Sequence, residues 1–277
     1  MSAEIFDGKA FAKNLEAALK ERVARLRRPP VAAVFYGSNV SEVASYVKSK
    51  SNRAQAASVS LRLMDVATMP PDLFLAHLEQ AGRDPEVDAV VVELPLPFKI
   101  ERDALFSRIP PEKDADGFHP ANLGRLFAGE PLIAPATPVA VIRILDAAGI
   151  ALKGKDTVVI GRSLVVGRPL VALLILRDAT VTVCHTKTQD LAGHAKRAEI
   201  LVAAAGKPGI VTTNMVRPGA VVIDVGVNYV NGKMTGDVEF DRVKEIASFI
   251  TPVPGGVGPV TTIALLENIV AIAERRA

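Results

Sequence analysis

The sequence has few of the residues on which disulfide-rich and zinc-binding proteins depend. Cys184 is the only cysteine among 277 residues, and there is no tryptophan. A single cysteine excludes an intrachain disulfide and a zinc site built from several cysteines. Because Cys184 ends the apolar run TVTVC, we expect its thiol to be buried in a protein core.

Signals for secretion, for membrane insertion and for nucleic-acid binding are scarce as well. The first residues, MSAEIFDGKAF, have neither the basic start nor the apolar stretch of a secretory signal. Apolar runs stop well short of the ~20 residues that a membrane-spanning helix needs. The net charge is only +3, and the basic residues are scattered along the chain. We therefore expect a cytoplasmic protein that contacts neither a membrane nor nucleic acid.

Metal-binding patterns are equally rare. The four histidines lie far apart in sequence, and none of them forms a metal-type pair. Asp114 and Asp116 stand two apart in KDADG, but no further ligand cluster lies nearby, so we expect no metal site. At least one of these acids is expected to hold the turn through bonds to backbone N–H groups. The other could accept hydrogen bonds from the N–H donors of an aminopyrimidine.

What the sequence does have is a repeated switch between helical and strand-like spacing of apolar residues. VAAVFYG, VSLRLMDV and DAVVVELPLP indicate strands separated by helical segments, and DTVVIG, ATVTVC, EILVAAAG and AVVIDVG continue the pattern. Such alternation predicts an α/β protein with mostly parallel sheets covered on both faces. We expect two lobes, residues 1–118 and 119–256, with the terminal helix 257–277 packing back on the first. The second lobe is expected to be Rossmann-like.

A strand, a glycine-containing loop and an apolar helix follow one another in DTVVIGRSLVVGRPLVALLIL. The loop, between Gly161 and Gly167, departs from the dinucleotide fingerprint G-x-G-x-x-G because Ser163 occupies the place of the second glycine. The pattern alone is compatible with a nucleotide site. It is also compatible with a turn whose glycines only allow tight packing.

The end of the next strand favours a cofactor with an additional phosphate. In an NAD site, an acid about twenty residues after the glycines holds the ribose 2′-hydroxyl. Here the strand ATVTVC is followed by His185-Thr186-Lys187-Thr188, without a carboxylate. Arg162 adds a cation suited to a phosphate. These residues predict NADP rather than NAD.

Tyr46 and Lys50 stand four residues apart in a segment without glycine or proline, so they should share one helical face. A phenol beside an ammonium serves as an acid–base pair in some oxidoreductases, and it is also a common surface arrangement. Glu93 closes the buried strand in ELPLP, at the end where α/β sheets bind ligands, and needs solvent or a partner. Gly255 and Gly256 in TPVPGGVGP predict an unusually shaped loop, with either a structural or a ligand-binding role.

Eight segments occur in one order along nearly the entire chain: YVKSK, ELPLP, EKDADGFHPANLGRL, PATP, GRSLVVGRP, GKPGIV, GAVVIDVGVN and ITPVPGGVGPVT. Together they closely resemble the bifunctional methylenetetrahydrofolate dehydrogenase/methenyltetrahydrofolate cyclohydrolase family. The resemblance implies NADP-dependent oxidation of 5,10-methylenetetrahydrofolate to 5,10-methenyltetrahydrofolate. Hydrolysis to 10-formyltetrahydrofolate would follow. It also implies a folate-binding N-terminal lobe, a dinucleotide-binding C-terminal lobe and a homodimer.

The resemblance implies roles for individual residues. The family's catalytic tyrosine and lysine match Tyr46 and Lys50, and its pterin-binding aspartate matches Asp116. Glu93 and Asp116 complete the expected catalytic set. The remaining folate-binding candidates are Leu94, Pro254, Gly255 and Gly256, and the cofactor-binding candidates are Gly161, Arg162, Ser163, Thr186 and Val227.

The chain departs from the family pattern at several positions. Glu93 stands where the family usually has glutamine, and the other departures are Ala136, Ala140 and Leu164. Glu93 leaves two alternatives open: a dehydrogenase with little cyclohydrolase activity, and a non-catalytic folate- or nucleotide-binding regulator. A short-chain dehydrogenase also has tyrosine and lysine four apart, but there the glycine loop precedes the tyrosine. Here YVKSK comes first.

Overall fold

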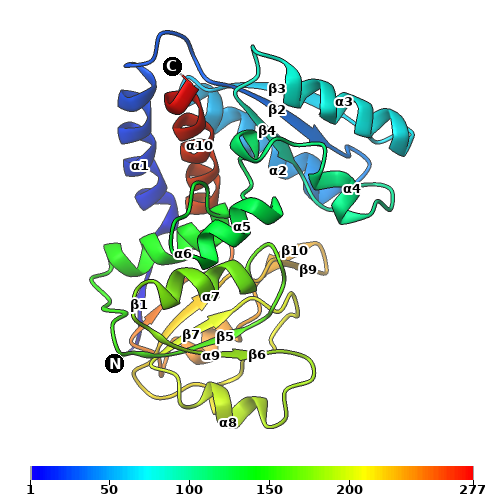
Figure 1. Cartoon of the computed structure of the whole chain (residues 1–277). Coiled ribbons are helices and arrows are strands. Elements are labelled where there is room, and N and C mark those ends of the chain that lie inside the picture. Colours follow the sequence, from blue (N-terminus) through cyan, green and yellow to red (C-terminus); the bar gives the residue numbers. More distant parts are fainter. Residues whose placement is uncertain (1, 277) are drawn as a thin grey trace. The chain divides into compact units, whose positions relative to one another are not determined.

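The computed structural model describes residues 2–276, and of residues 41, 42 and 45 only the backbone is described. The chain packs as two units, each with its own parallel sheet (Figure 1). The first unit consists of the segment that ends at Ala12 and of Thr137–Thr261, and it therefore contains most of the predicted second lobe. The second consists of Lys13–Ala136 and the segment from Thr262 onward. The division after Ala136 lies later in the chain than the boundary that the sequence predicts.

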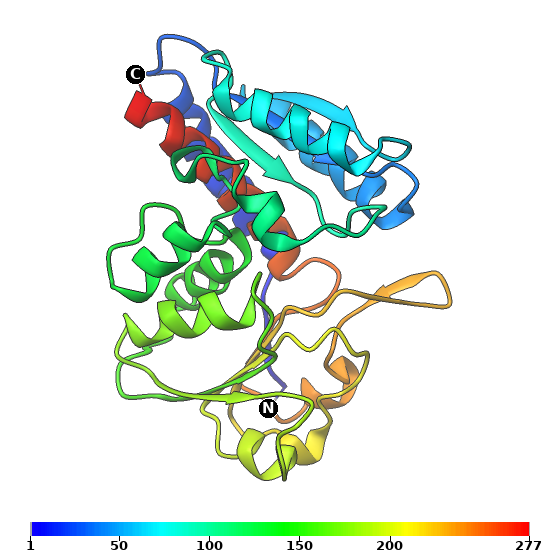
Figure 2. The same ribbon diagram turned by 45° about the vertical axis from the view of Figure 1, so that its right-hand side comes forward.

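The second unit contains a three-stranded sheet in the order β3-β2-β4, in which both strand pairs are parallel. Its strands are β2 (Val31–Tyr36), β3 (Ser60–Asp65) and β4 (Ala89–Val92), and its long crossover helices are α2 (Ser41–Ala56) and α3 (Pro71–Arg83). Because the chain moves from β2 to one edge and then to the other, right-handed crossovers place the two helices on opposite faces (Figure 2).

The core of this unit forms where α3 meets the sheet. Phe35 of β2 and Phe74 of α3 have no exposed surface, and their ring centroids lie 5.7 Å apart in an edge-to-face arrangement. Shorter helical elements follow the sheet along the chain: α4 (Arg102–Phe106), η1 (Pro111–Lys113) and α5 (Pro120–Phe127). Sequence periodicity did not predict them, because three to eight residues are too few for a helical pattern to stand out.

The terminal helix α10 (Val257–Arg276) lies beside α1 (Gly8–Val23). Within the second unit, Arg22 pairs with Glu274 at 2.8 Å, and Asn268 donates to the carbonyl oxygens of Ala115 and Ala134. By length and composition α10 is apolar enough to cross a membrane, contrary to the expectation from the sequence. However, 61% of its most apolar window is buried inside the protein, which is typical of a core helix.

The first unit contains a six-stranded parallel sheet in the order β1-β11-β8-β7-β5-β6. The strands are β1 (Glu4–Ile5), β5 (Asp156–Ile160), β6 (Thr180–Cys184), β7 (Ile200–Ala203), β8 (Val221–Asp224) and β11 (Phe249–Ile250). From β5 the chain continues to β6 on one side, whereas from β7 it continues to β8 on the other. The strand order therefore reverses between β5 and β7.

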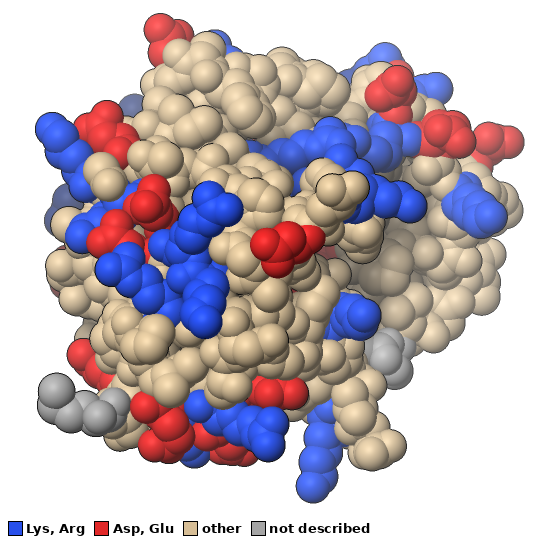
Figure 3. Space-filling model, turned by 90° about the horizontal axis from the view of Figure 1, so that it is seen from below, with Lys and Arg blue, Asp and Glu red and all other residues tan. Residues whose placement is uncertain are grey.

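Other elements of this unit are α6 (Ala136–Ala147), α7 (Gly167–Ile175), α8 (Leu191–Ala195), η2 (Thr213–Met215), α9 (Phe240–Val243) and the hairpin of β9 (Asn228–Val230) and β10 (Lys233–Thr235). Cys184 is fully buried in the core, as its apolar context predicts. On the face drawn in Figure 3, basic and acidic side chains lie interspersed, so neither sign covers that face alone.

Candidate active site

Helix α2 carries Lys50 on its buried face. Val43, Val47, Lys50 and Ala54 follow one helical stripe and are all buried, and Lys50 is only 2% exposed. The Lys50 ammonium lies 4.7 Å from the centroid of the Tyr46 ring, which is 36% exposed. The two side chains therefore share one face, as the spacing predicts, with the lysine inside and the phenol at the surface.

Glu93 meets this lysine from the end of β4. Its backbone N–H donates to the carbonyl oxygen of Phe35 at 2.9 Å, which extends the pairing of β4 with β2 by one residue. The buried carboxylate of Glu93 forms an ion pair with the Lys50 ammonium. Lys50 is thus the partner that a carboxylate at the end of a buried strand requires.

Asp116 completes a group of three titratable side chains. Its carboxylate accepts a hydrogen bond from the backbone N–H of Val92 at 3.0 Å, beside the end of β4. Although part of Asp116 stays open to solvent, loss of water around the carboxyl and the nearby Glu93 raise the pKa of Asp116 to about 8. At neutral pH this side chain is therefore protonated.

The pKa of Lys50 is shifted upward. Burial alone lowers the pKa of an ammonium, but electrostatic interactions with Tyr46, Glu93 and Asp116, together with the hydrogen bond to Glu93, outweigh burial and raise the pKa of Lys50. The resting state at neutral pH is a lysine ammonium paired with a glutamate carboxylate, next to a neutral aspartic acid. This cluster can store a proton and move it over a short distance.

Asp114 has a different role from Asp116. It is buried and accepts hydrogen bonds from the backbone of Gly117 at 3.1 Å, from the backbone of His119 at 2.8 Å and from the Asn122 side chain at 3.0 Å. Asp114 is therefore the acid of KDADG that holds the turn. Among the described side chains, histidine, cysteine, aspartate and glutamate form no group of three that could hold a metal ion.

The remaining folate candidates are divided between the two units. Leu94 lies next to Glu93 in the second unit and is exposed. Pro254, Gly255 and Gly256 belong to the first unit, in the loop between β11 and α10. In this loop Gly255 has φ +106°, a backbone angle that L side chains rarely adopt.

The two glycines of the loop after β5 allow close packing. A Cβ on Gly161 would lie 2.1 Å from the carbonyl oxygen of Ala204, and a Cβ on Gly167 would lie 2.3 Å from the carbonyl oxygen of Gly161. Ser163 accepts hydrogen bonds through its Oγ from the backbone N–H groups of Val166 and Gly167, at 3.2 Å and 3.4 Å, just where α7 begins. The glycines thus have the packing role that the sequence left open, and they bring the loop close to the end of β7.

The cofactor candidates gather at the carboxyl edge of the six-stranded sheet. Gly161 donates to the carbonyl oxygen of Cys184 at 2.9 Å, so the loops after β5 and β6 begin side by side. Arg162 and Thr186 are exposed on these two loops, and Val227 is exposed just after β8. Ligands of such sheets bind at this edge, where the strand order reverses. Exposed Arg162, Thr186 and Lys187, without a carboxylate at the end of β6, suit a dinucleotide that carries an extra phosphate.

Sequence reasoning missed two buried acids at the same edge, Asp224 at the end of β8 and Asp237 after β10. The loss of water around the Asp224 carboxyl raises its pKa to about 6. One signal was present in the sequence: an acid directly after the apolar run AVVI, like Glu93 after VVV, needs hydrogen-bond donors.

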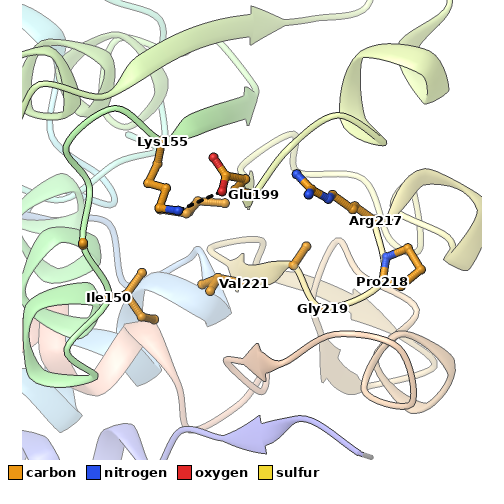
Figure 4. A pocket seen from close by; sticks show the side chains of 10 residues that line it. Ile150, Lys155, Glu199, Arg217, Pro218, Gly219 and Val221 are labelled. Carbon is orange, nitrogen blue, oxygen red and sulfur yellow. Dashed lines mark hydrogen bonds and ion pairs between the residues drawn. The ribbon is translucent and has the colours of Figure 1, made fainter.

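A pocket of about 240 Å³ lies at the opposite, amino edge of this sheet, before β5, β7 and β8 (Figure 4). The ion pair between Lys155 and Glu199, 2.8 Å long, lies in this pocket, and Arg217 points toward the same glutamate. Parallel sheets bind ligands at the carboxyl edge. We therefore assign this pocket no part in the chemistry of the cluster around Lys50.

The chain matches two descriptions of known domains. The tetrahydrofolate dehydrogenase/cyclohydrolase catalytic domain matches residues 6–116, and the NAD(P)-binding domain of the same name matches residues 135–277. The chain is 47% identical to the bifunctional protein FolD of Burkholderia cenocepacia (strain HI2424), over 100% of this chain and 99% of that protein.

Solved structures show the same similarity in three dimensions. The bifunctional FolD of Campylobacter jejuni superposes with a TM-score of 0.94 at 38% identity, over 100% of both chains. A dehydrogenase-cyclohydrolase (FolD) of Trypanosoma brucei, complexed with NADP cofactor and inhibitor, also has a TM-score of 0.94, at 37% identity over 100% of this chain and 99% of that chain.

Proposed function

The chain belongs to the tetrahydrofolate dehydrogenase/cyclohydrolase family, and we infer from this membership that it is a bifunctional enzyme of one-carbon metabolism. It oxidises 5,10-methylenetetrahydrofolate to 5,10-methenyltetrahydrofolate with NADP+ and hydrolyses the product to 10-formyltetrahydrofolate. A non-catalytic binder and a dehydrogenase without cyclohydrolase activity are not favoured, because similarity to bifunctional proteins covers the whole chain. The observation that carries the assignment of residues is the cluster of Lys50, Glu93 and Asp116 at the end of β4.

The second unit is proposed to bind the folate. The protonated Asp116 faces the end of β4, and two adjacent N–H donors of a pterin would favour its ionised form. We therefore expect folate binding to lower the pKa of Asp116 and to release a proton. The exposed ring of Tyr46 offers a stacking surface for the aminobenzoate ring, and exposed Leu94 offers a second apolar contact. The loop of Pro254, Gly255 and Gly256 is proposed to contact the same substrate.

Lys50 is proposed to move protons during the hydrolytic step. A water molecule adds to the methenyl carbon and gives up a proton, and the neutral amine of Lys50 accepts it. When the C–N bond breaks, the added hydroxyl becomes the formyl C=O and releases its proton to solvent, while the Lys50 ammonium gives a proton to the leaving nitrogen. The positive charge of the methenyl substrate lowers the pKa of Lys50, whereas Glu93 raises it. Glu93 therefore sets the pH range in which the amine can act.

The first unit is proposed to bind NADP. When bound, NADP+ supplies the acceptor for the hydride of the methylene carbon. The exposed guanidinium of Arg162 and the hydroxyl of Thr186 are placed to bind phosphate oxygens. The Ser163 hydroxyl, whose oxygen accepts from the backbone N–H of Val166, keeps its hydrogen free to donate. Gly161 and Val227 complete the edge against which the dinucleotide lies. Because hydride transfer depends on alignment, these residues act by positioning.

We also propose that the enzyme is a cytoplasmic homodimer. The hairpin of β9 and β10 supports self-association, because Tyr229, Val230 and Met234 expose apolar surface on only two short strands. Light scattering on the purified protein would report a mass of twice 29.3 kDa. A monomer at micromolar concentration would contradict the dimer.

An absorbance assay tests the reaction itself. NADP-dependent formation of methenyltetrahydrofolate reports the first step, and its disappearance reports the second. Combining Lys50→Met with Glu93→Gln removes the amine without leaving an unpaired buried carboxylate. Lys48→Met is a matched control, because Lys48 lies on the same helix but is exposed. Equal hydrolysis by both variants would contradict the role of Lys50, and no oxidation by the unmodified protein would contradict the function.

A further inference from the structure

Asp237 is a buried carboxylate that accepts hydrogen bonds from backbone N–H groups and from one side-chain amide. It has no exposed surface, and its two oxygens accept four hydrogen bonds. One oxygen accepts from the backbone of Ala205 at 2.6 Å and of Gly206 at 2.9 Å. The other accepts from the backbone of Lys207 at 2.8 Å and from the Asn228 side chain at 2.9 Å. An ionised carboxylate, which accepts at both oxygens and donates at neither, suits these four donors.

The donors come from the loops after two neighbouring strands. Residues 205–207 follow β7 and are exposed, whereas Asn228 follows β8 and is next to the cofactor candidate Val227. Ala204, which precedes the first loop, lies against Gly161. A Cβ on Gly161 would be 2.1 Å from the carbonyl oxygen of Ala204. The loop therefore flanks the point between β5 and β7 where the strand order reverses, and where sheets of this kind bind nucleotides.

A second buried acid holds Asp237 in place. Asp224 accepts from the backbone N–H groups of Gly226 at 2.9 Å, Asp237 at 3.0 Å and Val238 at 3.0 Å. Each of these two carboxyl groups lies so close to a glycine that no side chain would fit at that position. A Cβ on Gly226 would lie 2.3 Å from the Asp237 carboxyl carbon, and one on Gly236 would lie 1.9 Å from an Asp224 oxygen. The glycines of DVG and TGD thus make room for two linked carboxylates.

We propose that Asp237 is a positioning residue for NADP. It fixes the backbone of residues 205–207 and the side chain of Asn228 beneath the cofactor edge, so that the dinucleotide meets a preformed surface. This inference rests on the proposed binding of NADP to the first unit. A loop without this anchor would have to become ordered when the dinucleotide binds, which weakens binding without altering the folate site. The effect should therefore appear in the KM for NADP+.

The test is Asp237→Asn, which keeps the shape of the side chain but turns an N–H group toward backbone N–H donors. We expect the KM for NADP+ and the dissociation constant of NADPH, followed by its fluorescence, to rise about tenfold, because buried donors lose their acceptor. Hydrolysis of methenyltetrahydrofolate, measured without dinucleotide, should stay within about twofold, because the proton cluster lies in the other unit. Asp241→Asn is the control, because this nearby acid is exposed and pairs only at the surface with Lys244.

Asn228→Ala provides a second variant that removes one donor and leaves the carboxylate in place. We expect a smaller rise in the KM for NADP+, about threefold, with normal hydrolysis. An unchanged KM in both variants would overturn the proposal, and so would equal losses of oxidation and hydrolysis in Asp237→Asn, which indicate general destabilisation. The unmodified protein is assayed first: if it oxidises no substrate with NADP+, the proposed function fails and this inference fails with it.

Discussion

Replacing Glu93 by glutamine tests how the proton cluster is tuned. The change keeps the length of the side chain and its ability to accept a hydrogen bond from Lys50, but it removes the charge of the buried ion pair. Glu93 is one of the groups that raise the pKa of Lys50 against the effect of burial, and it adds to burial in raising the pKa of Asp116. Both pKa values should therefore fall in the variant.

The size of the effect follows from the electrostatics of a close pair. Two unit charges about 4 Å apart interact by about 4 kcal/mol at an effective dielectric constant of about 20. Part of the change is offset, because Asp116 loses its proton more readily in the variant and then attracts the ammonium itself. We therefore expect a net fall in the pKa of Lys50 that is smaller than the full interaction of the pair.

The assay is hydrolysis of methenyltetrahydrofolate between about pH 6 and 9, the range toward which the positive charge of the bound substrate lowers the pKa of Lys50. If the neutral amine of Lys50 is the base, the rate rises with pH, and in Glu93→Gln this rise moves toward acid pH. NADP-dependent oxidation, followed in parallel, should change less because it depends on alignment. Glu101→Gln is the matched control, because Glu101 is an exposed glutamate of the same unit.

An unchanged pH profile in Glu93→Gln would refute this reasoning. It would mean either that Lys50 is not the group whose titration limits hydrolysis, or that the ion pair with Glu93 does not persist when substrate binds. A shift toward alkaline pH would contradict it equally, because removal of a negative charge cannot raise the pKa of a neighbouring ammonium.

Three further outcomes follow from the same residues. Lys50→Met should abolish hydrolysis while Lys48→Met does not, and hydrolysis at the unmodified rate would refute the assignment. Arg162→Ala should weaken the binding of NADP+ by about 1.5–3 kcal/mol, the range for a charge-assisted hydrogen bond, and should change the binding of NAD+ little. Arg197→Ala, at an exposed arginine, is the control. Equal effects on the binding of both cofactors would contradict a phosphate contact. The pKa of Asp116 is raised to about 8 in the folded protein, so its contribution to stability is fully present below about pH 4 and is lost as the pH rises to about 8. The melting temperature of the unmodified protein, relative to Asp116→Asn, should therefore fall between about pH 5 and 8 and then level off; a difference that does not depend on pH would contradict this.

The sequence alone determined the elements whose patterns are local. The apolar runs predicted β2, β4 and β5, and the absence of glycine and proline predicted the helix that carries Tyr46 and Lys50. Alternation of helix and strand predicted parallel sheets, because parallel strands need crossover connections. The ordered motifs also identified the family, since eight segments in one order do not depend on knowing any contact. The short strands β1 and β9 were not predicted, because their pairing partners define them.

The tertiary structure alone decided which of these residues meet. Glu93 clearly needed a partner, but only the packing of α2 on the sheet places Lys50 against it, 43 residues away. The carboxylates of KDADG look alike in sequence, yet Asp114 holds the turn while Asp116 turns toward the end of β4. Asp237 lies 30 or more residues beyond the loop that it anchors. Partners, burial and pKa shifts depend on distances across the fold, and those distances arise only when elements remote in sequence pack together.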